Sequence, residues 1–265
     1  MSDTPPPPPE GTVRLERHGD TAVISLARPE KLNALTPAML GQLAGCADAV
    51  HADDTVRAVL VTAEGDRAFC AGADLGAFAD HDALAVWRHW VHTGHEAFRR
   101  LASLRQPTIA VLQAGAFGGG LELALACDLR VAADTARLGL PEVGIGTLPG
   151  WGGTARLAAL IGPARAKRLI LTGDLVDAAT ALQWGLVDEV ASAGRVRETA
   201  DRLAAAIARR GPVAVQLAKQ VLNHATPSSA EAFEALAGAL SAATDDRAEG
   251  LAAFHDRRTP RFLGR

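Results

Sequence analysis

The chain has 265 residues, of which 48% are hydrophobic and 22% charged, and it carries a net charge of −3. This length and composition are typical of a globular protein with one large domain, or one domain with an appendage. A slightly acidic chain lacks the basic face that phosphate contacts need, so nucleic acid is excluded as the main partner. No apolar run is long enough to span a bilayer, so we expect no membrane partner either.

The N-terminal sequence MSDTPPPPPE has neither a basic segment nor an apolar one, so it does not resemble a signal peptide. The prolines at 5–9 predict an extended, exposed segment. We therefore expect a disordered Pro-rich tail over residues 1–11, with the fold starting near Thr12. The chain has only three cysteines and no CxxC pair, which suits a reducing compartment and predicts a cytoplasmic protein.

The fold is predicted to begin with a hairpin. Val13–Arg17 and Ala22–Leu26 are strand-like and flank the turn His18-Gly19-Asp20. A helix should follow, with Thr36 as its N-cap and Pro37 at its first position.

Further buried-strand patterns occupy Val56–Thr62, Thr108–Leu112 and Leu129–Ala132. Helical segments alternate with these strands, and the order resembles strand-strand-helix more than strict βαβ. The sequence therefore predicts an α/β core over residues 12–195.

From about Pro163 onward the pattern becomes mostly helical. Apolar residues recur at helical spacing in Val196–Arg209, Pro212–Asn223 and Ser229–Ala243. We place a boundary near residue 195 and expect residues 196–265 to form a helical region. Its apolar faces must be buried against another surface, which a lid or a subunit interface would provide.

Two Gly-rich turns carry the chemistry. FCAGADL (69–75) and FGGGLEL (117–123) each follow a strand, and the second opens a predicted helix. Glycines let a ligand approach the backbone closely, and the free N–H groups at a helix start attract a negative oxygen. The alternative is a tight turn with no ligand; a Walker loop is excluded because no Gly-Lys-Ser/Thr follows. Cys70 and Cys127 lie beside these turns and are expected to be small buried side chains, not nucleophiles.

Three segments in order, FCAGADL, FGGGLELALACD and PEVGIGTLPGWGGTARL, resemble the signature of the crotonase (enoyl-CoA hydratase/isomerase) family. Weaker matches are RPEKLNAL at 28–35, LTGDLVDAATALQWGLVDEV at 171–190 and FHDRRTPRFLGR at 254–265. The resemblance extends from about residue 12 to the end of the chain. It implies a crotonase spiral of ββα units with a C-terminal helical trimerisation region, in a homotrimer or homohexamer.

The resemblance also implies the reacting groups. In this family two backbone N–H groups bind the thioester carbonyl oxygen, and the matching residues are Ala73 and Gly119. Glu122 and Glu142 match the two catalytic glutamates of enoyl-CoA hydratases, which share one water and divide the proton transfers. Gly150 matches a residue whose N–H helps to hold that water. From the residues alone, Glu122 could instead be a solvated helix-start carboxylate, and Glu142 an exposed turn residue.

The partner implied by the resemblance is an acyl-CoA thioester. Coenzyme A is then part of the substrate, and neither a separate cofactor nor a metal is required. The expected substrate and CoA contacts are Lys31, Leu32, Ala71, Asp74, Leu75, Gly118, Phe254 and Arg257.

One histidine pattern remains outside these assignments. His89, His92 and His95 recur at three-residue spacing in a predicted helix. A metal site would use such residues, but a partly exposed helix face is the favoured interpretation. Trp87 and Trp90 in the same segment either line the acyl pocket or belong to the core.

The leading function is hydration of a trans-2-enoyl-CoA to a 3-hydroxyacyl-CoA. The first alternative is enoyl-CoA double-bond isomerisation or another acyl-CoA reaction of the family. Typical isomerases lack one of the two glutamates, whereas this chain has both Glu122 and Glu142. The second alternative is a non-catalytic CoA-binding or RNA-binding scaffold, which the acidic net charge and the two glutamates disfavour.

Overall fold

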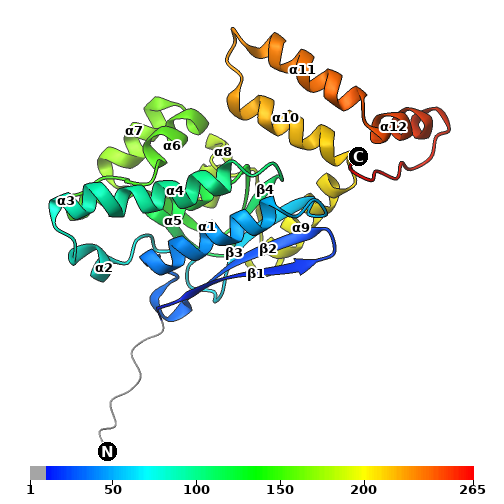
Figure 1. Ribbon diagram of the computed structural model, residues 1–265. Helices are drawn as coiled ribbons and strands as arrows, with labels where there is room; N and C mark the ends of the chain where they lie inside the picture. Colours follow the sequence, from blue (N-terminus) through cyan, green and yellow to red (C-terminus); the bar gives the residue numbers. More distant parts are fainter. Residues whose placement is uncertain (1–9) are drawn as a thin grey trace, which may run out of the picture.

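The computed structural model describes residues 10–265 (Figure 1). Nearly all of the predicted Pro-rich tail lies outside these residues. A six-stranded sheet has the order β1-β2-β3-β4-β6-β9. Its strands are β1 (Thr12–His18), β2 (Thr21–Ala27), β3 (Ala58–Ala63), β4 (Thr108–Leu112), β6 (Leu129–Ala133) and β9 (Glu189–Ala191). Only β1 and β2 pair antiparallel, as the predicted hairpin requires, and all other neighbours are parallel.

A second, three-stranded sheet has the order β5-β7-β8. It consists of β5 (Ala116–Phe117), β7 (Arg137–Gly139) and β8 (Val176–Asp177), with β5 parallel to β7 and β7 antiparallel to β8. Because β5 ends at Phe117, this sheet fixes the point at which the triple-glycine turn begins. The next element is helix α5 (Gly119–Leu125), the helix that the triple-glycine turn was predicted to open.

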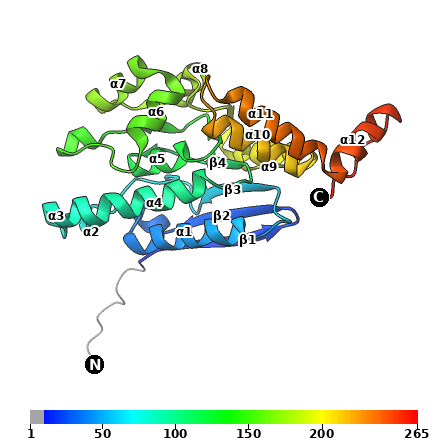
Figure 2. The same ribbon diagram turned by 45° about the horizontal axis from the view of Figure 1, so that its top comes forward.

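The helix after the hairpin is α1 (Pro37–His51), and its predicted start is confirmed. The Thr36 hydroxyl accepts a hydrogen bond from the Met39 N–H at 3.2 Å, and Pro37 occupies the first helical position. α1 packs beside α4 (Val91–Ala102) and against the hairpin, as Figures 1 and 2 show. These contacts bury the apolar side of α1 and place α4 where it can form one wall of a cavity.

Short helices and single helical turns connect these elements. They are η1 (Pro29–Lys31), α2 (Leu75–Ala79), α3 (Ala83–Ala85), the π-helical turn η2 (Val86–Trp90), η3 (Glu142–Ile145), α6 (Gly153–Ile161), α7 (Pro163–Thr172), α8 (Ala178–Trp184) and η4 (Ala193–Arg195). The predicted helix that holds the three histidines is therefore divided between α3, η2 and α4. A π-turn shifts the direction of the side chains that follow it, so η2 sets which residues of α4 face inward.

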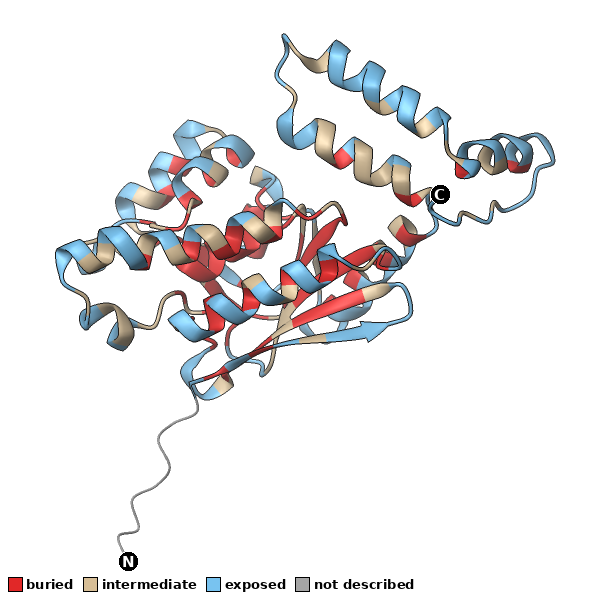
Figure 3. Ribbon diagram, in the orientation of Figure 1, coloured by how far each residue is buried: buried red, intermediate tan, exposed pale blue. Residues whose placement is uncertain are grey.

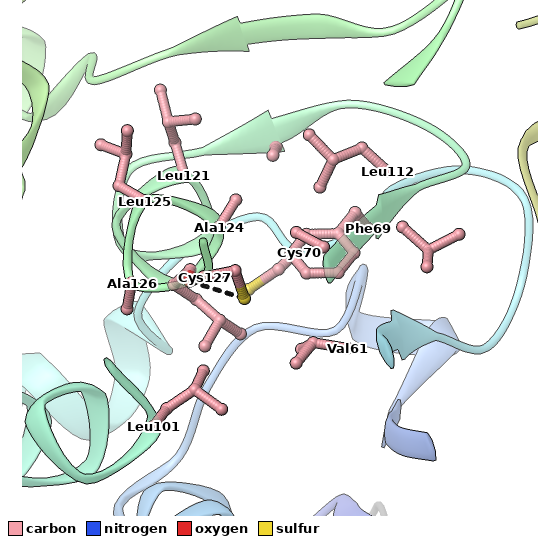
Figure 4. Close-up of a cluster of buried hydrophobic side chains, with 14 of the residues drawn as sticks. Val61, Phe69, Cys70, Leu101, Leu112, Leu121, Ala124, Leu125, Ala126 and Cys127 are labelled. Carbon is pink, nitrogen blue, oxygen red and sulfur yellow. Dashed lines mark hydrogen bonds between the residues drawn. The ribbon is translucent and has the colours of Figure 1, made fainter. Parts of the chain in front are cut away.

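The core around α5 is built from aliphatic side chains and a few aromatic ones, and Figure 4 shows part of it. Cys70 and Cys127 lie inside this cluster. Burial raises the pKa of each thiol to about 12, so both stay protonated at neutral pH. The expectation of small buried side chains is confirmed, because a protonated thiol is a poor nucleophile.

Beyond residue 195 the chain forms four helices, α9 (Val196–Ala208), α10 (Pro212–His224), α11 (Ala230–Ala242) and α12 (Asp245–His255). α9 packs against β3, β4 and β6 and buries Val196, Ala200 and Ala204. The other three project away from the sheet (Figure 1) and are mostly exposed (Figure 3). We call α10–α12 the C-terminal arm.

The C-terminal arm is attached to the body by a buried lysine. Lys219 of α10 is 7% exposed, and its Nζ lies 2.6 Å from the Asp128 carboxylate. It also donates to the carbonyl of Gln106 at 2.9 Å. Large apolar side chains nevertheless remain exposed on the arm: Leu222, Phe233, Leu236, Leu240, Leu251 and Phe254. Among residues 10–265, no helix is long and apolar enough to cross a membrane.

Candidate active site

A cavity of about 740 Å³ opens between the two Gly-rich turns, α4 and the segment 141–154. Its walls are mainly apolar and include Phe78, Val86, Trp90, Val91, Ile145, Leu148 and Trp151. A cavity of this size with few polar groups is typical of a small-molecule site.

The two Gly-rich turns meet at the cavity wall. The Phe117 N–H donates to the Cys70 carbonyl at 3.0 Å, which holds the turns together. A Cβ added to Gly72 would lie 3.2 Å from the Gly119 nitrogen, so no side chain fits between them. Gly118 adopts φ +52°, a conformation that residues with a Cβ rarely take. Glycine is therefore required here to bring two stretches of backbone into contact.

Two backbone N–H groups are left free at this meeting point. Within the described residues 10–265, neither the Ala73 nor the Gly119 N–H donates to a protein acceptor. A Cβ on Gly119 would lie only 3.4 Å from the Ala73 nitrogen, and both residues line the cavity. Two preorganised donors this close together can stabilise an oxygen that gains negative charge.

Glu122 projects from α5 and is 2% exposed. Its Oε1 accepts hydrogen bonds from the N–H groups of Trp151 at 2.8 Å and Gly153 at 2.7 Å. Burial raises the pKa of Glu122, and the two N–H groups oppose that rise because they favour the charged form. Glu122 is therefore a buried carboxyl group held in a fixed orientation. The alternative of a solvated helix-start residue is wrong.

Glu142 begins η3 and has a different environment. Both of its carboxyl oxygens are buried and, within residues 10–265, neither has a hydrogen-bond partner. Burial, with a smaller contribution from the charge of Glu122, raises the pKa of Glu142 to about 7. A Cβ on Gly118 would lie 3.2 Å from Oε1 of Glu142, which places this carboxyl group beside the free N–H groups. Glu142 can therefore hold or release a proton at neutral pH, as a general acid or base must.

Comparisons with known proteins agree with this geometry. A family model described as enoyl-CoA hydratase/isomerase matches residues 16–265. The chain is 38% identical over 249 residues to a short-chain-enoyl-CoA hydratase of Clostridium acetobutylicum, covering 93% of this chain and 95% of that one. It is 40% identical over 265 residues to an enoyl-CoA isomerase/hydratase of Zymoseptoria tritici, covering 93% and 85%.

The chain belongs to the enoyl-CoA hydratase/isomerase (crotonase) family. A crystal structure of an enoyl-CoA hydratase from Bacillus anthracis superposes with a TM-score of 0.92 at 38% identity, covering 96% of this chain and 99% of that one. The predicted crotonase-fold α/β architecture, with two mixed sheets and C-terminal helices, is confirmed. Membership implies acyl-CoA thioester substrates.

Several of the contacts predicted for a crotonase-family substrate lie at the cavity. Ala71, Leu75 and Gly118 line it, and so does Gly150, the residue predicted to help hold the water. Asp74 lies beside it but does not line it, because its carboxylate caps α2 and pairs with Arg28. Asp74 therefore shapes the turn that carries the Ala73 N–H.

The other predicted CoA contacts do not line the cavity of their own chain. Lys31 and Leu32 are exposed at the end of η1, where Leu32 has the left-handed φ of 53°. Phe254 is 86% exposed on α12, and Arg257 follows that helix. Figure 1 shows α12 far from α2 and α3, so the chain does not bring Phe254 and Arg257 to its own cavity.

Trp151 was not predicted as a site residue. Its backbone N–H anchors Glu122. Its ring packs against Trp90 in a tilted arrangement and against Phe98 edge to face, with centroids 5.5 Å and 5.6 Å apart. Its Nε1 donates to the Trp90 carbonyl at 3.3 Å, which ties η2 to the cavity. The sequence signal that could have identified Trp151 is its place as the lone large aromatic residue in the Gly-rich crotonase motif PEVGIGTLPGWGGTARL.

All three histidines are exposed, but His95 lines the cavity whereas His89 and His92 do not. Among residues 10–265, no group of three or more His, Cys, Asp or Glu side chains is arranged to hold a metal ion. Trp90 is both part of the core and a cavity wall, while Trp87 is 69% exposed.

Proposed function

We propose that this protein is an enoyl-CoA hydratase, which adds water to a trans-2-enoyl-CoA to give a 3-hydroxyacyl-CoA. One observation carries the proposal: two carboxyl groups of unlike environment face one cavity beside two free N–H groups. Glu122 is anchored by two amides, whereas Glu142 has no hydrogen-bond partner in residues 10–265 and a pKa of about 7. Hydration needs one group that accepts a proton and one that donates it.

In the proposed reaction the Ala73 and Gly119 N–H groups bind the thioester carbonyl oxygen. Glu122 and the Gly150 N–H hold a water, and Glu122 takes a proton from it as its oxygen bonds to the β-carbon. The electron pair of the double bond moves to the thioester, giving an enolate whose charge the two N–H groups stabilise. Glu142 then gives its proton to the α-carbon. Each donor is worth roughly 3 kcal/mol in comparable oxyanion sites.

The test is to supply purified protein with trans-2-enoyl-CoA esters of increasing chain length and follow the loss of conjugated absorbance. Glu122→Gln and Glu142→Gln should each lower kcat by orders of magnitude while acyl-CoA binding persists, because the amide keeps the shape but not the proton transfer. Near-wild-type rates in either variant would show that the proposed role of that glutamate is wrong.

A second candidate is enoyl-CoA double-bond isomerisation. The relative from Zymoseptoria tritici is named an isomerase/hydratase, and Glu142, with a pKa of about 7, is suited to shuttle a proton alone. A trans-3-enoyl-CoA separates the two reactions, since isomerisation creates conjugated absorbance and hydration removes it. If Glu122→Gln keeps isomerase activity and loses hydratase activity, Glu142 is the shuttle and both reactions use the same site.

We also propose the division into a core over 12–195 and a C-terminal helical lid or oligomerisation region over 196–265. The exposed apolar side chains of the C-terminal arm need a cover, and a second copy supplies one. Phe254 and Arg257 would then reach CoA only in the cavity of a neighbouring copy. Light scattering should give a trimer or hexamer, and a monodisperse monomer at micromolar concentration would contradict this assembly.

Lys31, Leu32, Ala71, Asp74, Leu75 and Gly118 are proposed to contact or position the CoA ester on the chain's own side. A cytoplasmic location is proposed as well, since all three cysteines are unpaired. Cell fractionation tests this location, and recovery with an oxidising compartment would contradict it.

A further inference from the structure

Arg156 is a half-buried arginine without an ion-pair partner. It lies on α6, and within residues 10–265 no carboxylate is within ion-pair distance of its guanidinium. The two buried arginines of this part of the chain, Arg28 and Arg130, differ because each pairs with an aspartate. Burying a charge without a partner costs free energy, so other groups must stabilise Arg156 where it lies.

The guanidinium of Arg156 binds the turn that holds Glu122. Its Nη1 donates to the Trp151 carbonyl at 2.9 Å. Trp151 donates its own N–H to Oε1 of Glu122 at 2.8 Å, and the Gly153 N–H does so at 2.7 Å. Between them, Gly152 has φ +98°, and a Cβ there would lie 2.6 Å from Nη1 of Arg156. A glycine at 152 therefore gives the turn its conformation and leaves room for the guanidinium.

The backbone of Arg156 holds the same turn from the helix. Its N–H donates to the Gly152 carbonyl at 3.1 Å. The Gly152 carbonyl and the Gly153 N–H belong to one planar peptide group, so this bond fixes one end of a group whose other end binds Glu122. The side chain and the backbone of Arg156 thus hold the two peptide groups on either side of Gly152.

Arg156 also supplies a positive charge that acts on Glu122. Arg156 faces Glu122 from α6, and Glu142 faces it from η3. Burial raises the pKa of Glu122, whereas the two N–H groups and the charge of Arg156 lower it. His95 of α4 lies beside Arg156 across Gly152. Burial and the charge of Arg156 lower the pKa of His95, so the imidazole adds no charge at neutral pH.

We propose that Arg156 is a positioning residue for Glu122. It holds the turn 151–153 so that two N–H groups stay directed at the carboxylate, and its charge favours the ionised form of Glu122. Arg156 does not line the cavity, so it acts through Glu122 and not on the substrate. The consequence for hydration rests on the proposed function, in which an ionised Glu122 takes a proton from water. The effect of Arg156 on the ionisation of Glu122 does not depend on that function.

The first test measures the ionisation of Glu122 without any substrate. Its carboxyl absorbance is obtained by infrared spectroscopy as the difference between each protein and its Glu122→Gln counterpart, and is followed against pH. Arg156→Gln removes the charge and keeps an N–H donor, and we expect it to move the midpoint for Glu122 upward by about one pH unit. Arg156→Lys keeps the charge and should stay near the wild type. Lys167→Gln on the neighbouring α7 is the matched control, because Lys167 is exposed and its replacement removes the same charge.

The second test is the pH dependence of kcat/KM for enoyl-CoA hydration. In Arg156→Gln the acidic limb should move upward together with the midpoint for Glu122. Arg156→Met also lacks a donor to the turn, and it should lower kcat about tenfold above that limb with KM nearly unchanged. A role in stability alone would leave the pH profile in place.

An unmoved midpoint for Glu122 in Arg156→Gln overturns the proposal, and so does an equal shift in Arg156→Lys or Lys167→Gln. An undiminished kcat in Arg156→Met overturns the positioning of the turn. The expected midpoint shift in a protein that hydrates no enoyl-CoA would overturn the proposed function alone.

Discussion

Replacing Glu142 by glutamine should make the protein more stable at alkaline pH. Burial raises the pKa of this carboxyl group from its usual 4.5 to about 7. In the unfolded chain the group ionises near its usual pKa, so above pH 7 folding must bury a charge that water would otherwise solvate. The pKa difference corresponds to about 3 kcal/mol at most, and water in the cavity reduces it, so we expect a gain of about 1–3 kcal/mol in Glu142→Gln.

The size of the stabilisation by Glu142→Gln depends on pH. Below the usual pKa the carboxyl group is protonated in both states, so the variant and the wild type should unfold alike at about pH 4 and differ at about pH 8. Urea unfolding at the two pH values measures this. Glu249→Gln is a control in which the change in stability should have the opposite sign. Arg258 lowers the pKa of Glu249 to about 2, so loss of the Glu249 carboxylate should destabilise the protein at neutral pH. A Glu142→Gln variant no more stable than wild type at about pH 8 would refute the reasoning.

Other predictions concern packing. A Cβ at Gly120 would lie 2.2 Å from the Cys70 carbonyl oxygen, so Gly120→Ala should cost about 1–3 kcal/mol in denaturant unfolding and lower activity by separating the two turns. Gly41 lies in α1 with open space around it, so Gly41→Ala should stabilise by about 0.5–1 kcal/mol in the same assay. Lys219→Met leaves the partly buried Asp128 unpaired and should cost about 2 kcal/mol. Relative to the wild type, amide hydrogen exchange in Lys219→Met should increase most in α10. Unchanged exchange there would contradict the role of Lys219 as the anchor of the arm.

Local sequence signals predicted the elements of the fold well where one physical cause dominated. The start of α1 follows from Thr36 and Pro37 alone, and β4 matches its predicted bounds because TIAVL is buried on both faces of a parallel sheet. The short strands β5, β7 and β8 were not predicted. Two or three residues carry no periodicity, and these strands exist only because tertiary contacts align them.

The residues of the site were predicted by motif, but their environments were not. Nothing in the spacing of Glu122 and Glu142 indicates that one carboxyl group is anchored by two amides and the other has no partner. That difference arises because Trp151 and Gly153 turn their N–H groups toward α5. His95 was placed in a stripe with two other histidines, because sequence spacing cannot show which of them the π-helical turn η2 directs into the cavity.

The pH dependence of kcat/KM for hydration of a short trans-2-enoyl-CoA tests the central claim most directly. Glu142 must be protonated to supply the α-proton, so kcat/KM should fall as the pH rises through about 7. Glu122 must be ionised to accept the proton of water, and its raised pKa predicts a second fall at acidic pH. A bell-shaped profile with its alkaline limb near pH 7 is the predicted result. A rate that stays constant from below pH 7 to well above it would contradict the division of work between the two glutamates.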